Sequence, residues 1–221
     1  MTVRDDYYGV ERWDVLPLIS NQARTILDVG SGNGATMSII KKKLPRARIV
    51  GVELNKSIAA SIGDLVLVGD IQATELREEL AALGEGFDCI LALDVLEHFI
   101  DPWEVLRYLT TLLNPGGYVL ISLPNLSNVK SLLPLLFLNR FEYQNAGILD
   151  RTHLRFFTRR EAIDLVEKCG LKLRDIIPTG PVSRNGVVSR AGLLAYVIHC
   201  LSFGRLERFV AHQYVLRASL D

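Results

Sequence analysis

The stretch Ile26–Gly34, which reads ILDVGSGNG, decides the fold class. A short apolar run leads directly into Gly30, Gly32 and Gly34, three glycines at alternate positions. Such a turn is typical of the point where a strand passes into a helix and a doubly wound sheet binds its ligand. Glycine permits a sharp turn and a close approach of the backbone to a ligand, because it carries no side chain. The stretch therefore predicts an open α/β sheet with a ligand site at this turn.

Short apolar runs alternate with helical patterns along the rest of the chain, which predicts a parallel sheet covered by helices on both faces. The expected strands are Thr25–Val29, Ile49–Glu53, Leu65–Val68, Phe87–Leu93, Gly117–Leu123, Leu171–Ile177 and Arg208–Ala218. The last two strands depart from the simple alternation of strands and helices. They indicate an antiparallel edge of the sheet that is interrupted by an inserted helix. We therefore expect a doubly wound α/β sheet of about seven strands, mostly parallel with an antiparallel C-terminal strand.

Two helices have recognisable starts. Asp101 can cap a helix with Pro102 and Glu104 in its first turn, and that helix should run to about Leu113, before Asn114-Pro115-Gly116-Gly117. Thr158 and Glu161 form a second capping-box pattern. A further apolar helix is expected near Arg190–Phe203.

Length and composition limit the domain organisation and the partners. A chain of 221 residues fits a single domain, 1–221, with acceptor-side inserts near 124–157 and 180–207. Lys plus Arg equals Asp plus Glu at 25 each, so no overall charge favours nucleic acid. The three scattered cysteines indicate buried thiols in a reducing compartment. The polar start and the interrupted apolar run Val187–Phe203 favour a cytoplasmic protein without a membrane span, with a membrane-surface helix as the alternative.

Acidic side chains in three successive strand-end turns narrow the ligand. Glu53 ends the second strand, where a carboxylate can accept hydrogen bonds from both ribose hydroxyls. Asp70 follows the third strand, where it can receive the exocyclic amine of an adenine, and Asp28 lies within the first turn. Three carboxylates suit an adenosine with a cationic sulfonium better than a pyrophosphate. The glycines alone leave a dinucleotide open, because with Ala35 they also satisfy the looser GxGxx(G/A) pattern.

Five motifs in order extend this pattern between Ile26 and Ile121: ILDVGSGNG, GVELN, VGD, FDCILALDVLEHFIDPWEVL and LLNPGGYVLIS. Together they resemble the motif set of class I S-adenosylmethionine-dependent methyltransferases. The resemblance implies a Rossmann-like fold, S-adenosylmethionine as cofactor and S-adenosylhomocysteine as product. It also implies cofactor contacts from Asp28, Gly30, Ser31, Gly32 and Gly34 around the methionine moiety, Glu53 and Leu54 at the ribose, Asp70 and Ile71 at the adenine, and Leu93 with Asp94 at the open side. Ser31 stands where many relatives carry cysteine, which should not alter binding.

A later stretch, LPNLSNVKSLL followed by GILDRTHLRFFTRREAIDLVEKCGL, is similar to a bacterial subgroup that shares features with ubiquinone-type O-methyltransferases. This similarity implies a small-molecule acceptor with an oxygen nucleophile, such as a saccharide, envelope or quinone-like precursor. The expected acceptor contacts are Asn125, Arg151 and Arg155. Arginine pairs bidentately with carboxylate or phosphate, so these arginines are compatible with an acidic acceptor. The alternative, which we prefer at this point, is a solvated helix-start face with one or two ion pairs.

Two histidines are candidates for the general base that a hydroxyl acceptor needs. His98 follows the fourth strand, and His153 lies in the acceptor-side insert. We favour His153, because His98 begins a helix beneath the cofactor, and local packing is the alternative for either residue. Asp94, Glu97 and His98 form a D-x-x-E-H cluster that resembles the metal-binding E-x-x-D-H of some quinone O-methyltransferases, with the acids in altered order. Because spacing only permits convergence of ligands, we assign no metal ligand and leave a divalent ion open.

Three classes of protein remain in falling order. The first is a methyltransferase, and the second is a non-catalytic S-adenosylmethionine-binding subunit of a biosynthetic complex. The third is a nicotinamide-dependent oxidoreductase, against which Asp70 argues. The apolar inserts SLLPLLFL and AGLLAYVIHCL line an acceptor site, belong to the core or form the face of a homodimer.

Overall fold

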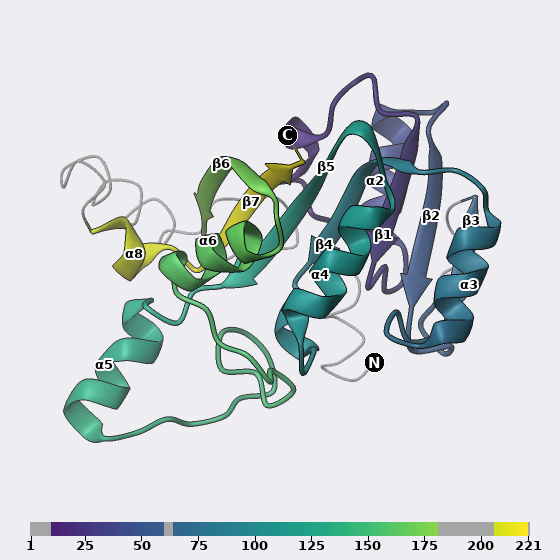
Figure 1. Cartoon of the computed structure of the whole chain (residues 1–221). Helices are drawn as coiled ribbons and strands as arrows, with labels where there is room; N and C mark the ends of the chain where they lie inside the picture. Colours follow the sequence, from purple (N-terminus) through teal and green to yellow (C-terminus); the bar gives the residue numbers. More distant parts are fainter. Residues whose placement is uncertain (1–9, 60–63, 181–205, 221) are drawn as a thin grey trace.

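The computed structural model describes residues 10–59, 64–180 and 206–220. A seven-stranded sheet runs through the molecule in the order β3-β2-β1-β4-β5-β7-β6 (Figure 1). Its strands are β1 (Thr25–Val29), β2 (Arg48–Glu53), β3 (Leu65–Val68), β4 (Phe87–Leu93), β5 (Leu113–Pro124), β6 (Lys172–Thr179) and β7 (Gln213–Ser219). Strands β1 to β5 pair in parallel, whereas β7 runs antiparallel to both β5 and β6. The predicted doubly wound sheet with an antiparallel C-terminal strand is confirmed.

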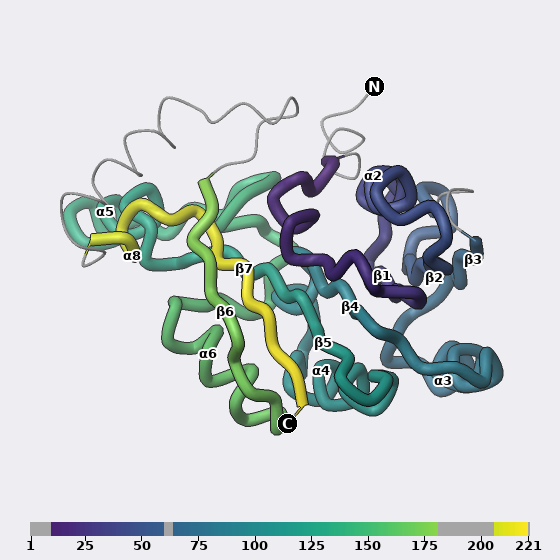
Figure 2. The backbone as a smooth tube through the Cα atoms, turned by 90° about the horizontal axis from the view of Figure 1, so that it is seen from above, coloured from purple at the N-terminus to yellow at the C-terminus, as the bar shows by residue number. Residues whose placement is uncertain are grey.

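Helices cover both faces of the sheet, as Figure 2 shows from above. One face carries α2 (Ala35–Lys43) and the short 3-10 segment η1 (Leu16–Leu18), and the other carries α3 (Thr74–Ala82), α4 (Pro102–Thr111) and α6 (Arg159–Lys168). Successive residues of a strand point to opposite faces, so the core divides into two apolar clusters. Ile26 of β1 packs in the cluster beneath α2, and Leu27 packs in the cluster beneath the other three helices.

Both predicted helix starts are confirmed. Asp101 caps α4 by accepting a hydrogen bond from the backbone N–H of Glu104 at 2.9 Å. Thr158 and Glu161 form a capping box at the start of α6. A side-chain acceptor at these positions satisfies backbone N–H groups that have no partner within the helix.

Two predicted boundaries were wrong. Helix α4 ends at Thr111, and residues 114–117 already belong to β5, because β5 begins with a pairing of Leu113 to Phe87. Strand β7 begins at Gln213 rather than Arg208, since the short helix α8 (Glu207–Val210) occupies the preceding residues.

The insert near 124–157 contributes helix α5 (Val129–Leu138), which projects away from the sheet in Figure 1. Its apolar side chains stay largely uncovered among the described residues; Leu136 is 64% exposed and Phe137 is 77% exposed. The SLLPLLFL stretch is therefore not part of the core. The helix expected near Arg190–Phe203, and with it most of the insert near 180–207, lies outside the described residues. Within the described part of the chain, no helix is both long and apolar enough to cross a bilayer.

Candidate active site

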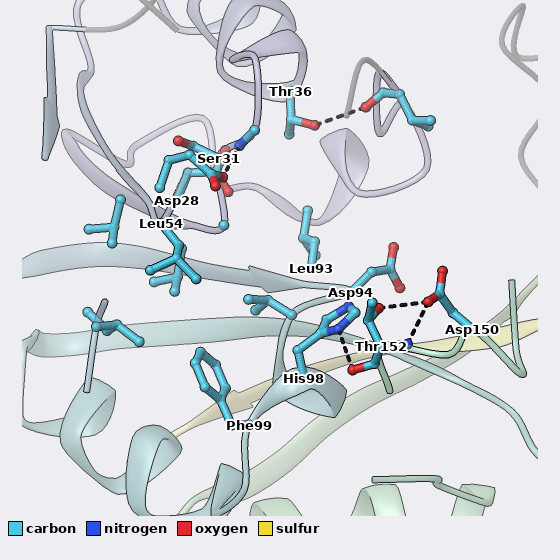
Figure 3. A pocket seen from close by; sticks show the side chains of 18 of the residues that line it. Asp28, Ser31, Thr36, Leu54, Leu93, Asp94, His98, Phe99, Asp150 and Thr152 are labelled. Atoms are coloured by element: carbon cyan, nitrogen blue, oxygen red, sulfur yellow. Dashed lines mark hydrogen bonds between the residues drawn. The ribbon is translucent and has the colours of Figure 1, made fainter. Parts of the chain in front are cut away.

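A cavity of about 1020 Å³ opens at the carboxyl ends of β1 to β4 (Figure 3). Its lining includes Asp28, Glu53, Asp70 and Asp94, each of which lies within two residues of the end of one of these four strands. Ligands of open α/β sheets bind outside the carboxyl ends of the strands, where the loops diverge. The volume matches that of pockets which enclose a small molecule.

The glycine turn forms part of this cavity wall. Gly30 has a φ of +77°, and a Cβ there would come within 3.0 Å of the side chain of Val95. The backbone N–H groups of Gly30 and Ser31 both donate to the carbonyl of Val52, which ties the turn to the end of β2. Gly34, also at positive φ, caps the start of α2 and lies outside the cavity lining. The first glycine allows close approach, and the last one starts the helix.

Glu53 connects the glycine turn to the end of β2. Its side chain is buried, and its two oxygens accept backbone hydrogen bonds from Gly32 at 2.8 Å and Asn55 at 2.9 Å. Each carboxylate oxygen has a second lone pair, so the side chain can still accept hydrogen bonds from a ligand in the cavity. Glu53 therefore shapes the turn and offers acceptors at the same time.

Asp28 is a buried carboxyl group with an unsatisfied oxygen. Its Oδ2 has no hydrogen-bond partner among the described residues, and neither has the Oγ of the neighbouring Ser31. Burial, and then the negative charge of Glu53, raise the pKa of Asp28 to about 7. A positively charged group of a ligand would stabilise the ionised form. The cavity therefore presents an incompletely satisfied acid at the position predicted to meet the cofactor's amino acid tail.

The cavity lining after β2 and β3 combines apolar and polar side chains. Leu54 lines it with 69% of its surface exposed, and Ile71 lines it as a buried residue. Asp70 and Gln72 also belong to the lining, and Oδ1 of Asp70 accepts a hydrogen bond from the backbone N–H of Gln72. Apolar side chains beside a carboxylate provide the kind of environment that suits an adenine ring.

Arg12 is a cavity residue that the sequence interpretation missed. Its guanidinium is buried and pairs with Asp94 and Asp14, and it donates to the Oγ of Ser122 at 3.0 Å. Burial alone would lower the pKa of Arg12, but the carboxylates raise it above its ordinary value. Asp94 adopts a positive φ of 52°, which is unusual for a residue with a side chain. Because Arg12 and Asp94 are 82 residues apart, no local sequence pattern indicates this ion pair.

His98 is the predicted base that reaches the cavity. Its half-buried ring lines the wall, and its Nδ1 lies 3.1 Å from the carbonyl oxygen of Thr152 (Figure 3). Since a carbonyl only accepts, Nδ1 carries the proton and the neutral ring keeps Nε2 as its acceptor. Asp150 accepts hydrogen bonds from both the backbone and the hydroxyl of Thr152. The insert thus holds the ring in one tautomer.

The preference for His153 as the base requires correction. The residue is only 5% exposed and is not among the lining residues, while its Nδ1 lies 3.1 Å from the carbonyl oxygen of Ile148. A ring enclosed in this way cannot meet an acceptor directly in this conformation. The insert has folded back on itself, which the position of His153 in the sequence could not indicate.

Two of the three residues predicted to contact the acceptor bind backbone carbonyls of the protein instead. Asn125 is fully buried, and its amide donates to the backbone carbonyls of Arg208 and Ala211. Arg155 donates to the carbonyl of Ile100 and lies outside the cavity lining. Both side chains join the insert to neighbouring elements, so they are corrected from acceptor contacts to structural ones.

Arg151 remains as the predicted acceptor contact that lines the cavity. It is exposed, and no hydrogen bond or ion pair of its guanidinium occurs within the described ranges. The neighbouring basic residues differ, since Arg159 approaches Glu207 and Arg160 pairs with Asp164. His212 joins the lining from the residue before β7, a position that carries no recognisable motif.

The three residues of the D-x-x-E-H pattern do not form one metal-ligand group. Asp94 is paired with Arg12, whereas atoms of Glu97, His98 and His153 that could bind a metal ion lie within 4.8 Å of one another. The third residue of this group, His153, comes from the insert.

Comparison with known proteins assigns this chain to a family. Residues 10–176 match the family model described as a methyltransferase domain. The match covers well over half of the chain, and the sheet order and glycine turn agree with it. The chain therefore belongs to the methyltransferase domain family. This assignment overturns the oxidoreductase interpretation.

Individual relatives support the assignment. The chain is 29% identical over 162 residues to the ubiquinone biosynthesis O-methyltransferase of Aeromonas salmonicida, a match that covers 69% of this chain and 65% of that enzyme. A structure of an O-methyltransferase family protein from Burkholderia thailandensis superposes with a TM-score of 0.61 at 15% identity, over 94% of this chain and 55% of that chain. A methyltransferase structure from Archaeoglobus fulgidus gives a TM-score of 0.59 at 19% identity, over 97% and 93% of the two chains. The matched part is thus less than two thirds of the length of the first two proteins.

Proposed function

We propose that this chain transfers the methyl group of S-adenosylmethionine to an oxygen of a small-molecule acceptor and releases S-adenosylhomocysteine. The observation that carries the proposal is a single cavity with two unlike walls. Asp28, Glu53 and Asp70 form one wall at the strand ends, and His98 with Arg151 belongs to the other. The relatives are named as O-methyltransferases, which supports catalysis over a purely cofactor-binding subunit.

The first wall suits each part of the cofactor. Glu53 would accept hydrogen bonds from the ribose hydroxyls, and Asp70 would receive the adenine amine beside the apolar surfaces of Leu54 and Ile71. Asp28 would face the positively charged amino acid tail, with the glycine turn against it. Leu93 and Asp94 would close the side nearest the acceptor.

The chemistry needs alignment more than it needs reactive groups. Methyl transfer from a sulfonium is an in-line displacement with a neutral leaving group. Alignment of the two reactants can therefore supply much of the rate enhancement. The acceptor oxygen would form a bond to the methyl carbon as the carbon–sulfur bond breaks, and the electron pair of the broken bond would stay on sulfur. Nε2 of His98 would accept the hydroxyl proton and pass it to solvent.

Arg151 defines the acceptor more finely. An exposed guanidinium without a partner in the described structure can pair with a carboxylate or phosphate on the acceptor. We infer a hydroxylated acceptor that carries such an acidic group, a description that includes a quinone-like precursor. The relatives' name, ubiquinone biosynthesis O-methyltransferase, supports the oxygen nucleophile of this acceptor.

The test is methyl transfer from labelled S-adenosylmethionine to paired compounds. A dihydroxybenzoate and the corresponding catechol without the carboxylate share the nucleophile and differ only in the acid. The proposal expects a labelled O-methyl product from the acid and slower transfer to the neutral compound. Label transferred only to amine or thiol acceptors would contradict the oxygen assignment, and a faster neutral catechol would contradict the role of Arg151.

A further inference from the structure

Behind the cavity wall, Glu97, His153 and His98 form a compact group whose hydrogen bonds are incomplete. Glu97 is fully buried, and both of its carboxyl oxygens lack a partner among the described residues. Nε2 of His153 is also unpartnered and lies 3.9 Å from the Oε1 of Glu97. Unpartnered polar atoms in a protein interior are costly, so this arrangement requires an explanation.

The tautomer of His153 shows what is missing. Its Nδ1 faces the carbonyl of Ile148 at 3.1 Å and must therefore donate. In the neutral ring, Nε2 is then an acceptor that lies 3.9 Å from the Glu97 carboxyl, roughly 1 Å beyond ordinary hydrogen-bond distance. Two neighbouring acceptors repel unless a proton or a cation lies between them.

The surrounding charges decide which partner holds that proton. The groups that act electrostatically on the two residues are Asp94 after β4, Asp150 in the insert, Arg12 in the N-terminal segment and the adjacent His98. Arg12 already pairs with Asp94 and Asp14. Burial, and then the charge of Asp94, raise the pKa of Glu97 well above its ordinary value. Burial and His98 lower the pKa of His153, so both directions favour a neutral pair.

We propose that Glu97 is a protonated carboxylic acid that donates its hydrogen bond to Nε2 of His153, and that this neutral pair positions His98 for catalysis. The pair lies directly behind the catalytic ring, since the rings of His153 and His98 are 4.9 Å apart in an edge-on contact. The backbone carbonyl of Glu97 also accepts hydrogen bonds from Leu154 and Arg155, which attaches the insert to the segment that carries His98. Glu97 and His153 are positioning residues, because neither lines the cavity.

A neutral pair has a chemical consequence for His98. If His153 were an imidazolium, its positive charge would disfavour a second positive charge on His98 and weaken it as a base. With the proton on Glu97, His98 can accept the acceptor's proton without an adjacent cation. This consequence rests on the proposed function, whereas the protonation of the pair does not.

Two spectroscopic measurements test the protonation without any acceptor. Nitrogen NMR of histidine-labelled protein at neutral pH should show His153 protonated on Nδ1 alone, with its signal assigned by its loss in His153→Gln. The infrared difference between wild type and Glu97→Gln should contain the carbonyl stretch of a protonated carboxylic acid. A doubly protonated His153, or a carboxylate band in place of the acid band, would overturn the proposal.

The pH dependence of stability gives an independent comparison. A buried acid with a raised pKa keeps its proton when folded and loses it on unfolding, so stability falls as pH rises above the ordinary pKa of glutamate. Wild type should show this fall more steeply than Glu97→Gln, whose amide can donate the same hydrogen bond without titrating. Parallel stability curves would contradict the proposal. If Glu97→Gln fails to fold, the NMR measurement on wild-type protein still decides.

Kinetics with an acceptor then test the positioning role. Glu97→Ala should lower kcat about tenfold or more, because the ring of His98 loses its support, and Glu97→Gln should recover most of that loss. Equal losses in the two variants would show that the donated hydrogen bond has no role. A divalent ion retained at one equivalent per chain after dialysis, and removed by Glu97→Gln, would replace the proton and overturn the proposal. If the wild-type protein shows the infrared band of protonated Glu97 but transfers no methyl group, only the proposed function is contradicted.

Discussion

The two walls of the cavity differ in how their side chains are held. On the cofactor wall, Asp28, Glu53 and Asp70 lie within two residues of the ends of adjacent strands, and backbone hydrogen bonds fix Glu53 and Asp70 where they stand. On the acceptor wall, His98 depends on a carbonyl of Thr152, 54 residues away, in an insert that folds back over it. The side chains of the cofactor wall are placed by the ends of neighbouring strands, whereas the acceptor wall depends on an insert that is remote in the sequence.

This difference predicts different responses to substitution. Changes on the cofactor wall should weaken cofactor binding and leave the chemistry intact once the cofactor is bound. Changes on the acceptor wall should alter turnover or acceptor affinity and spare cofactor binding. Measuring binding of S-adenosylhomocysteine beside turnover separates the two effects.

The largest effect is expected for His98→Ala. Loss of a general base lowers the rate about 100-fold to 10,000-fold, while affinity for S-adenosylhomocysteine should stay within about twofold. His153→Gln is the matched comparison and should cost less, because that ring does not reach the cavity. Near-normal turnover in His98→Ala at neutral pH would show that transfer proceeds by alignment alone.

Glu53→Ala should weaken binding of S-adenosylhomocysteine by roughly 1 to 3 kcal/mol, because hydrogen bonds from the ribose to a carboxylate are lost. Calorimetry measures the affinity, and thermal unfolding checks that the glycine turn survives without its bond from Gly32. Glu85→Ala removes a partly exposed carboxylate outside the cavity lining and serves as the control. Equal affinities for the two variants would mean that the ribose is held elsewhere.

Cofactor affinity should also depend on pH through Asp28. Its pKa is about 7 in the unliganded protein, and a positively charged ligand favours the ionised form. Binding of S-adenosylhomocysteine should therefore weaken as pH falls below about 7, approaching tenfold per pH unit. Asp28→Asn should bind more weakly at high pH and lose this slope. If the affinity of the wild-type protein stays constant across this pH range, Asp28 does not interact with the charged amino acid tail.

Arg151→Gln should have the smallest effect, a rise of about fivefold to tenfold in KM for an acidic acceptor with little change in kcat. Arg160→Gln removes a similar charge that is paired with Asp164 on α6 and should leave KM unchanged. If the neutral catechol shows the same rise in KM as the acid, Arg151 acts through general charge or packing rather than through a paired acid group.

The sequence predicted the strand ends well because strand position alone brings their side chains together. Gly30, Glu53 and Asp70 each lie at or just after the end of an apolar run predicted as a strand, so their convergence follows from the order of the strands. The same reasoning could not find Arg12, whose partner Asp94 is remote in sequence. It also gave Asn125 the wrong surroundings, since the carbonyls of Arg208 and Ala211 that surround it come from the C-terminal region.

The histidines show where pattern reasoning ends. His98 and His153 carry the same chemistry, and their places in the sequence favoured the wrong one for direct contact. Only the folded insert reveals that His153 lies behind His98. Charge balance in the interior, which depends on Asp94, Asp150 and Arg12 together, likewise has no counterpart in a local motif.

The central claim is that the cavity at the strand ends is an S-adenosylmethionine site rather than a site for another nucleotide. Calorimetric titration of the chain at neutral pH with S-adenosylhomocysteine, and separately with NAD, tests it most directly. The account predicts saturable binding of S-adenosylhomocysteine at one site per chain, weakened in Glu53→Ala, and no saturable binding of NAD. Saturable binding of NAD without binding of S-adenosylhomocysteine would contradict it.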